Sequence, residues 1–340
     1  MNGFQRVAAA LRGERPDAVP VMLHNFMHAA READVPMGRY RRDPGAAARV
    51  HIRSVEKYGY DGVLLDLDTA TLAGALGVPV DLPEDQPGRC REGMLPSLEA
   101  ARDLPPPDVG RYPAVQTWLE AARILQGHFG KEVYVRGNCD QCPFSLAGLV
   151  RGPAEWMMDL MDPKLEDAAR RLLEYCTEAT LQFLRLMAGT GVPMVSNGDS
   201  PAGPDLVSPA LYRRFALPSE RRVAGEAHRL GLAYVLHVCG DTTRILDDMI
   251  STGADGLELD YKTDAALAHA KMKDRTAFIG NIDPSAVLTA GTPAQVEAKA
   301  RELVALFADT PRFILNAGCA IPATAPGENV RALIRAARSR

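Results

Sequence analysis

The stretch Ala233-Tyr-Val-Leu-His-Val-Cys-Gly-Asp-Thr-Thr243 joins a short apolar run to a histidine and a cysteine. The run from Tyr234 to Leu236 is typical of a buried strand, and the reactive residues follow where that strand would end. Side chains alternate between the two faces of an extended chain, so His237 and Cys239 are predicted to point the same way. An imidazole and a thiol in that arrangement supply half of a zinc site.

A second apolar run ends in a cysteine in the same manner. The sequence Arg312-Phe-Ile-Leu-Asn-Ala-Gly-Cys319 predicts a strand with a thiol at its end, which makes Cys319 our candidate for the missing ligand. The alternative is a core histidine beside a small buried thiol, and His-x-Cys alone would favour it. The matching strand-end position of Cys319 favours a metal site formed by His237, Cys239 and Cys319.

An apolar strand with a polar end, followed by helical periodicity, occurs eight times along the chain. Besides the opening stretch, the predicted strands cover residues 19–25, 62–68, 132–138, 192–199, 256–260, 276–283 and 313–319. Near-continuous apolar strands that alternate with helices indicate a parallel sheet, and eight repeats predict an α/β fold, a single (β/α)8 TIM barrel over residues 1–340. The alternative is a doubly wound open sheet, which the lack of Gly-x-Gly-x-x-Gly after any strand disfavours in its dinucleotide-binding form.

Two segments lie outside this repeat. Residues 1–15 predict a short amphipathic N-terminal helix, because Arg12 and Glu14 interrupt an apolar run too short for an export signal. Residues 77–113 are rich in proline and glycine, and predict an elaborated loop between strands 2 and 3 that is long enough to act as a lid. Helices are predicted at residues 44–58, 115–129, 143–150, 165–187, 208–230 and 293–307, with another ending at Gly253 and a last one through Ala336.

Composition limits the classes of function. The 340 residues are 46% hydrophobic, which suits a globular protein with a large core. A net charge of −4 gives no general attraction to nucleic acid or anionic lipid, and no apolar run approaches the roughly 20 residues that span a bilayer. The six cysteines, without an export signal, are expected to be reduced thiols. We therefore expect a cytoplasmic protein with neither nucleic-acid nor membrane partners.

Every predicted strand ends in polar or reactive residues, and in a barrel these ends converge on the face where active sites lie. Single members have simpler explanations, since Asp199 could hold a turn and Asp283 could cap a helical turn. The whole set is better explained by one polar cavity. The strand-end residues are His24, Asn25, Asp66, Asp68, Asn138, Asp199, His237, Cys239, Glu258, Asp260, Asn281, Asp283, Asn316 and Cys319.

Two thiolates and one neutral imidazole would leave a bound Zn²⁺ formally uncharged, with a fourth position open as in catalytic sites. A substrate thiol at that position would have a lowered pKa. Our candidate fourth ligands or catalytic bases are Asp199, Glu258 and Asp260, with a preference for Glu258 because its strand neighbours that of His237. The candidates for cofactor binding are His24, Asn25, Asn138 and Asn281.

The other cysteine motif is Cys139-Asp-Gln-Cys142. A lone Cys-x-x-Cys is a weak indication of zinc. Cys142 precedes Pro143 at a predicted helix start, where the pKa of a thiol tends to fall. A redox or auxiliary metal role is one interpretation, and two unremarkable thiols that line the cavity are the interpretation we favour.

With these residues assembled, the chain resembles the uroporphyrinogen decarboxylase superfamily over nearly its full length. The decarboxylases of that superfamily carry arginines after the first strand that grip the carboxylates of the substrate. Here that place reads His24-Asn-Phe-Met-His-Ala-Ala30, which lacks such bidentate clamps. The matching motifs are Arg6-Val-x3-Leu-Arg-Gly-Glu-Arg-Pro-Asp-x-Val-Pro-Val21, Pro143-Phe-Ser-Leu-Ala147 with Arg151-Gly152, Val207-Ser-Pro-x-Leu-Tyr212, His237-x-Cys-Gly240 and Gly280-Asn-Ile-Asp-Pro284.

His237, Cys239 and Cys319 match the zinc-dependent corrinoid methyltransferases of the superfamily position for position. The resemblance therefore implies transfer of a methyl group from a methylated corrinoid, either methylcobalamin or a partner corrinoid protein, to a small thiol acceptor such as coenzyme M. Cys142 departs from the pattern, in which glycine is expected before Pro-Phe. Two alternatives are a metal-free lyase that decarboxylates a porphyrinogen or another acid through Asp66, Asp68 or Asp199, and an idle barrel that only binds a corrinoid protein.

Overall fold

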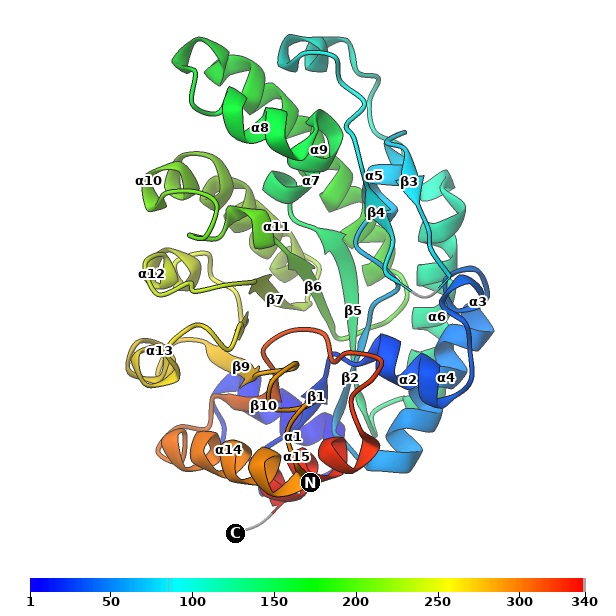
Figure 1. The fold of residues 1–340 in the computed structure, drawn as a ribbon, viewed down its shortest axis with the longest axis vertical. Helices are drawn as coiled ribbons and strands as arrows, with labels where there is room; N and C mark the ends of the chain where they lie inside the picture. The colour runs from blue at the N-terminus through cyan, green and yellow to red at the C-terminus, as the bar shows by residue number, and fades with distance from the viewer. Residues whose placement is uncertain (85, 339–340) are drawn as a thin grey trace.

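Eight parallel strands enclose the centre of the protein in the computed structural model, which describes residues 1–84 and 86–338 (Figure 1). A parallel bridge between Val21 and Leu315 joins the first strand to the last, and the Leu315 amide donates to the Pro20 carbonyl at 2.9 Å. The predicted (β/α)8 barrel is confirmed. In their order around the sheet the strands are β1 (Met22–Leu23), β2 (Gly62–Leu65), β5 (Tyr134–Gln141), β6 (Met194–Gly198), β7 (Ala233–Val238), β8 (Gly256–Leu259), β9 (Ala277–Ile282) and β10 (Phe313–Ala317).

Helices form a ring around these strands (Figure 1). Helix α4 has clear sequence signals at both of its ends. Asp43 is its N-cap, proline occupies its first position, and Gly59 follows its last residue at φ +69°. No helix among the described residues is both long and apolar enough to cross a bilayer. The larger helices are α4 (Pro44–Tyr58), α6 (Pro113–Phe129), α7 (Pro143–Arg151), α9 (Glu166–Ala188), α11 (Leu217–Arg229), α13 (Ala265–Met272), α14 (Pro293–Leu306) and α15 (Gly327–Arg338). The shorter ones are α2 (Phe26–Glu32), α3 (Met37–Arg42), α5 (Thr71–Ala75), α8 (Pro153–Asp159), α10 (Pro209–Leu211) and α12 (Leu246–Ile250).

The predicted N-terminal helix is α1 (Gly3–Arg12), and it closes one end of the barrel. Asn2 caps it and exchanges hydrogen bonds with Gln5 in a capping box. Its buried side chains, among them Val7 and Leu11, belong to one apolar cluster with strand residues that point into the barrel. Those strand residues are Met22, Tyr134, Met194, Val235, Ala277, Ile279 and Ile314.

The structure differs from the sequence prediction in several places, and the helices α5, α8 and α13 were not predicted. The segment after β1 contains α2 and α3, which have seven and six residues and are too short to show a helical period over a window of 11–18 residues. The helix predicted over residues 208–230 is interrupted by a π-helical segment, Tyr212–Ala216. Pro218 follows that segment, and proline supplies no N–H to an α-helical ladder. The predicted loop 77–113 contains the hairpin of β3 (Val80–Asp81) and β4 (Arg89–Cys90), and short 3₁₀ turns at Leu98–Asp103 and Val109–Arg111.

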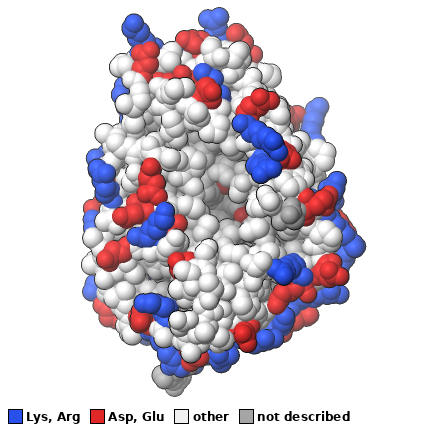
Figure 2. Space-filling view, viewed as in Figure 1, with Lys and Arg blue, Asp and Glu red and all other residues white. Residues whose placement is uncertain are grey.

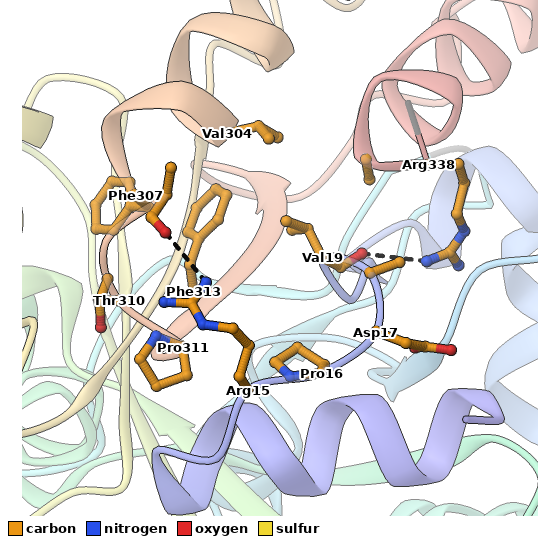
Figure 3. Close-up of a pocket in the computed structure, with 13 residues that line it drawn as sticks. Arg15, Pro16, Asp17, Val19, Val304, Phe307, Thr310, Pro311, Phe313 and Arg338 are labelled. Atoms are coloured by element: carbon orange, nitrogen blue, oxygen red, sulfur yellow. Dashed lines mark hydrogen bonds between the residues drawn. The ribbon is translucent and has the colours of Figure 1, made fainter. Parts of the chain in front are cut away.

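A hollow of about 390 Å³ lies at the amino-terminal ends of β1 and β10 (Figure 3). Two arginines bridge its walls, because Arg15 donates to the Ala308 carbonyl and Arg338 donates to the Val19 carbonyl, both at 3.1 Å. It is lined by the segment 15–19, by α14 and by the end of α15. None of the described residues that line it is a histidine or a cysteine, and its position opposite the carboxyl ends of the strands excludes it as the cavity predicted above.

The buried carboxylate of Asp61 ties the elements at this end together. One of its oxygens accepts from the Val21 amide at 2.8 Å and from Arg338 at 2.6 Å, and the other accepts from Arg6 at 3.1 Å. Asp61 therefore links α1, the first strand and α15 through one buried group.

Asp61→Ala is expected to lower the free energy of unfolding by about 3 kcal/mol, since it removes one acceptor from Arg6 and one from Arg338 and leaves the buried Val21 amide without its side-chain acceptor. Urea denaturation followed by circular dichroism measures the change. The control is Asp17→Ala, which also removes a partner of Arg6 but at an exposed position, where a loss below about 1 kcal/mol is expected. Equal losses in the two variants would show that Asp61 has no special part in closing the barrel.

Candidate metal centre

A cavity of about 160 Å³ lies at the carboxyl ends of the strands. The face shown in Figure 2 is hollowed near its centre, and most charged side chains on that face lie toward its edge. The cavity wall combines apolar residues, such as Phe26 and Leu64, with many polar side chains. The polar side chains are His24, Asp66, Thr69, Arg136, Asn138, Asp140, Gln141, Asn197, Ser200, His237, Cys239, Glu258 and Cys319.

Three of these side chains bring their ligand atoms to one point. The ligand atoms of His237, Cys239 and Cys319 all lie within 4.8 Å of one another. Nε2 of His237 is 3.1 Å from Sγ of Cys239, which is 3.8 Å from Sγ of Cys319. Both cysteines are free thiols. Tetrahedral zinc with bonds of about 2.3 Å to sulfur and 2.0 Å to nitrogen separates its ligand atoms by about 3.5–3.8 Å, so the cluster has the size of a zinc site.

Without a metal, the cluster holds a thiolate beside an imidazolium, whose proton a bound cation would replace. Burial lowers the pKa of His237, but the Cys239 sulfur outweighs it and raises that pKa to about 10. The thiol of Cys319 and the His237 imidazole lower the pKa of Cys239 to about 3, and the same contact raises the pKa of Cys319. The protein alone thus stabilises one thiolate of the pair, and a divalent cation would stabilise the second.

A backbone contact orients the imidazole. Nδ1 of His237 lies 3.0 Å from the carbonyl oxygen of Glu258, so it donates its hydrogen there and directs Nε2 at the two sulfurs. Contacts of this kind from the second shell fix the tautomer of metal-binding histidines. Strand register explains the contact, because His237 and Glu258 are direct neighbours in β7 and β8.

The Glu258 side chain belongs to a buried charge network beside the cluster. Its carboxylate pairs with Arg136, lies 3.5 Å from Nδ1 of His24 and accepts from Asn316 at 3.4 Å. Burial opposes ionisation, but Arg136 and His24 hold the pKa of Glu258 well below its usual range. Nε2 of His24 in turn lies 2.9 Å from Asp66. Glu258 therefore contacts the cluster through its backbone, while its carboxylate is engaged by Arg136.

Arg136 was missed by the sequence analysis, which noted only Asn138 on the same strand. The signal was present, because the two residues share one face of the strand and a charged residue is almost never fully buried without a partner. A buried arginine in an apolar strand therefore indicates an acidic partner inside the barrel.

Several predicted site residues lie outside the cavity lining. Asp199 was expected to open onto the same cavity as His24, His237, Glu258 and Cys319, but it is fully buried and accepts from the Ser145 amide at 2.8 Å and hydroxyl at 2.5 Å. It thus anchors the start of α7.

Asp260 and Asn281 hold the loops after β7 and β8. Asp260 accepts from the Gly240 amide at 2.9 Å, and Asn281 donates to the Asp260 and Thr263 carbonyls at 3.1 Å. Asn25 donates to Ser54 at 3.1 Å behind the cavity wall. Of the four candidates for cofactor binding, His24 and Asn138 line the cavity, and Asn25 and Asn281 do not.

Cys139 and Cys142 are fully buried and do not line the cavity, contrary to the interpretation we favoured. The sulfur of Cys142 lies 3.5 Å from the Tyr234 hydroxyl. The expected fall in its pKa is wrong, because burial and the nearby Asp199 raise the pKa of Cys142 well above its usual value. Its position before α7 does not offset the loss of solvent.

Comparisons with known proteins find methyltransferases and a decarboxylase among the relatives of this chain. Methylcobamide:CoM methyltransferase MtbA of Methanosarcina mazei is 32% identical over 232 residues, which are 68% of this chain and 65% of that protein, so the match spans slightly less than two thirds of the relative. MtaA of Methanosarcina barkeri, with the same activity in its name, is 29% identical over 97% of this chain and 96% of its own. A uroporphyrinogen decarboxylase of Synechococcus sp. is 27% identical over 97% of this chain and 95% of its own.

A solved structure described as a methyltransferase from Methanosarcina mazei superposes with a TM-score of 0.90 at 25% identity, and covers 99% of this chain and 98% of its own. The family described as uroporphyrinogen decarboxylase (URO-D) matches residues 2–340. With that match running along almost the whole barrel, the chain belongs to the uroporphyrinogen decarboxylase family.

Proposed function

We propose that this protein is a zinc-dependent transferase, which moves a methyl group from a methylated corrinoid to a small thiol such as coenzyme M. The corrinoid would be free methylcobalamin or the cofactor of a partner corrinoid protein. The observation that carries the proposal is the cluster of one imidazole and two thiols at the cavity wall. The names of MtbA and MtaA support the proposal. Decarboxylases belong to the same family, so the choice between a methyltransferase and a decarboxylase rests on the site.

Two features of the cavity favour the methyltransferase branch. Its volume of about 160 Å³ is below the ~300–1,000 Å³ typical of drug-sized ligands, so it admits a small thiol but no porphyrinogen. A polycarboxylate also needs several cations, and Arg136, the one lysine or arginine on the described wall, is already paired with Glu258.

His237 Nε2, Cys239 Sγ and Cys319 Sγ would hold the zinc, which when bound would supply a Lewis acid that lowers the pKa of an acceptor thiol. Hydrogen bonds within the protein hold His237 and Cys239, two of these ligands, in position. The Glu258 carbonyl accepts from Nδ1 of His237, and the Ser200 hydroxyl accepts from the Cys239 amide at 3.3 Å. Asp260 accepts from the next amide, that of Gly240.

The proposed transfer is a direct displacement. A lone pair of the acceptor sulfur forms the new S–C bond, and the Co–C bond breaks with its electron pair left on cobalt. The thiol proton is released to solvent. The corrinoid ring, which is too large for the cavity, would stay at the mouth and present only its methyl group.

Cys239→Ala and Cys319→Ala are each expected to lose bound zinc and methyl transfer together, because either change leaves two strong ligands. Zinc per chain, measured by atomic emission after dialysis, should fall at least tenfold. Circular dichroism reports whether the variants fold.

The matched control is Cys142→Ser, which alters a thiol away from the cluster and should keep one zinc per chain. Zinc retained at the wild-type level in both alanine variants would refute the proposed ligand set.

Demethylation of methylcobalamin by 2-mercaptoethanesulfonate (coenzyme M) is expected from the zinc-loaded protein and not from chelator-treated protein, with recovery on adding zinc. Absorbance of the corrinoid follows the reaction, and decarboxylation of a porphyrinogen is assayed beside it. Decarboxylation by zinc-free wild-type protein would show that the chain works as a lyase. Zinc-loaded protein that binds a methylated corrinoid protein without turnover would indicate a binding module.

A further inference from the structure

Three residues that line the cavity each have an acceptor oxygen with no hydrogen-bond partner in the described part of the chain. These oxygens are Oδ1 of Asp66, Oδ1 of Asp140 and Oδ1 of Asn197. The three residues are only 3%, 2% and 1% exposed. A buried acceptor without a donor is destabilising, so this set indicates a donor that a bound molecule would bring.

The other polar atom of each of these side chains already makes a hydrogen bond, which fixes the position of the unpartnered oxygen. Oδ2 of Asp140 accepts from the Leu72 amide at 2.7 Å, and Oδ2 of Asp66 lies 2.9 Å from His24. The Asn197 amide group donates to the Cys139 carbonyl at 2.6 Å.

The charges on the wall leave one carboxyl group without a counter-ion. Arg136 is paired with Glu258, and His24 is paired with Asp66. Asp140 has no ion pair among the described residues, and burial and the neighbouring Asp68 raise its pKa well above the usual value. A cation bound beside Asp140 would offset both effects, whereas an anion there would add repulsion.

We propose that the preferred acceptor thiol carries an ammonium group, which Asp140, Asp66 and Asn197 bind in preference to the sulfonate of coenzyme M. An ammonium group has three N–H donors and one positive charge, which correspond to three free oxygens and one uncompensated carboxylate. The inference rests on the proposed function and specifies its substrate.

Two nitrogens of wall residues have no hydrogen-bond partner among the described residues, Nε of Arg136 and Nδ1 of His24. Glu258 and Asp66 balance the positive charges of Arg136 and His24. The two nitrogens can therefore donate hydrogen bonds to an anion, but no net charge attracts the anion to them. The cavity volume does not distinguish the ammonium thiol from the sulfonate thiol. A volume of 160 Å³ holds about five water molecules at ~30 Å³ each, so either thiol fits. Charge is therefore the property that selects the acceptor.

A matched series tests this: 2-aminoethanethiol, 2-mercaptoethanol and 2-mercaptoethanesulfonate differ only in the group at the far end. We expect kcat/KM for methyl transfer from methylcobalamin to be at least tenfold higher for the ammonium thiol than for the sulfonate, at equal thiolate concentration. Calorimetry on the zinc-loaded protein should give the same order of Kd without turnover.

Asp140→Asn is the informative variant. Asparagine can still accept from the Leu72 amide and tolerates the φ of +59° at this position. The ratio of kcat/KM for the ammonium thiol to kcat/KM for the sulfonate should fall at least tenfold. Comparing ratios between proteins cancels the intrinsic differences among the thiols. The control is Asp205→Asn, an exposed carboxylate near Gly240 and outside the cavity lining, which should leave the ratio unchanged.

A wild-type preference for the sulfonate, or an ammonium preference that survives in Asp140→Asn, would overturn the inference. If zinc-loaded protein methylates none of the three thiols, the proposed function fails instead, and the calorimetric order still decides the charge preference of the cavity.

Discussion

Closure of the parallel sheet between β1 and β10 is the constraint on which the rest of the structure depends. All eight strands run in the same direction, and closing the ring brings their carboxyl ends together around one mouth. Cys319 follows the last strand and His237 ends the fifth, 82 residues earlier, yet their ligand atoms lie within 4.8 Å. An open sheet of the same strands would keep three strand spacings between β7 and β10. The cluster of His237, Cys239 and Cys319 is thus a product of the closed barrel.

The two ends of this barrel are built from different interactions. At the base, α1 fills the interior with apolar side chains, and Asp61 joins α1 to α15. Near the mouth, the interior holds a charged pair, Arg136 and Glu258, which is almost fully excluded from water. A buried ion pair is a weak source of stability. Its position beside His237 suits a role in holding the site, since the same Glu258 supplies the carbonyl that orients the imidazole.

Polar residues at strand ends have two different tasks in this chain. Some line the cavity, as His237 and Asp140 do. Others point away from it and fix a loop or a helix, as Asp199 does for α7 and Asp260 for the turn after Cys239. Both kinds look alike in the sequence, because each follows an apolar run and carries an oxygen or nitrogen.

The sequence by itself determined the order of strands and helices, the barrel, and the pairing of His237 and Cys239 with Cys319. These follow from apolar periodicity, from caps such as Asp43 and Gly59, and from alternation along a strand, all of which are local. Only the tertiary structure decided which strand-end groups face the cavity, because that depends on the rotation of each strand end and on the loop after it. It also revealed the partner of Arg136 and the deep burial of Cys142, since both depend on neighbours more than 90 residues away. Charge balance inside a barrel arises between strands distant in the chain, and no local pattern encodes it.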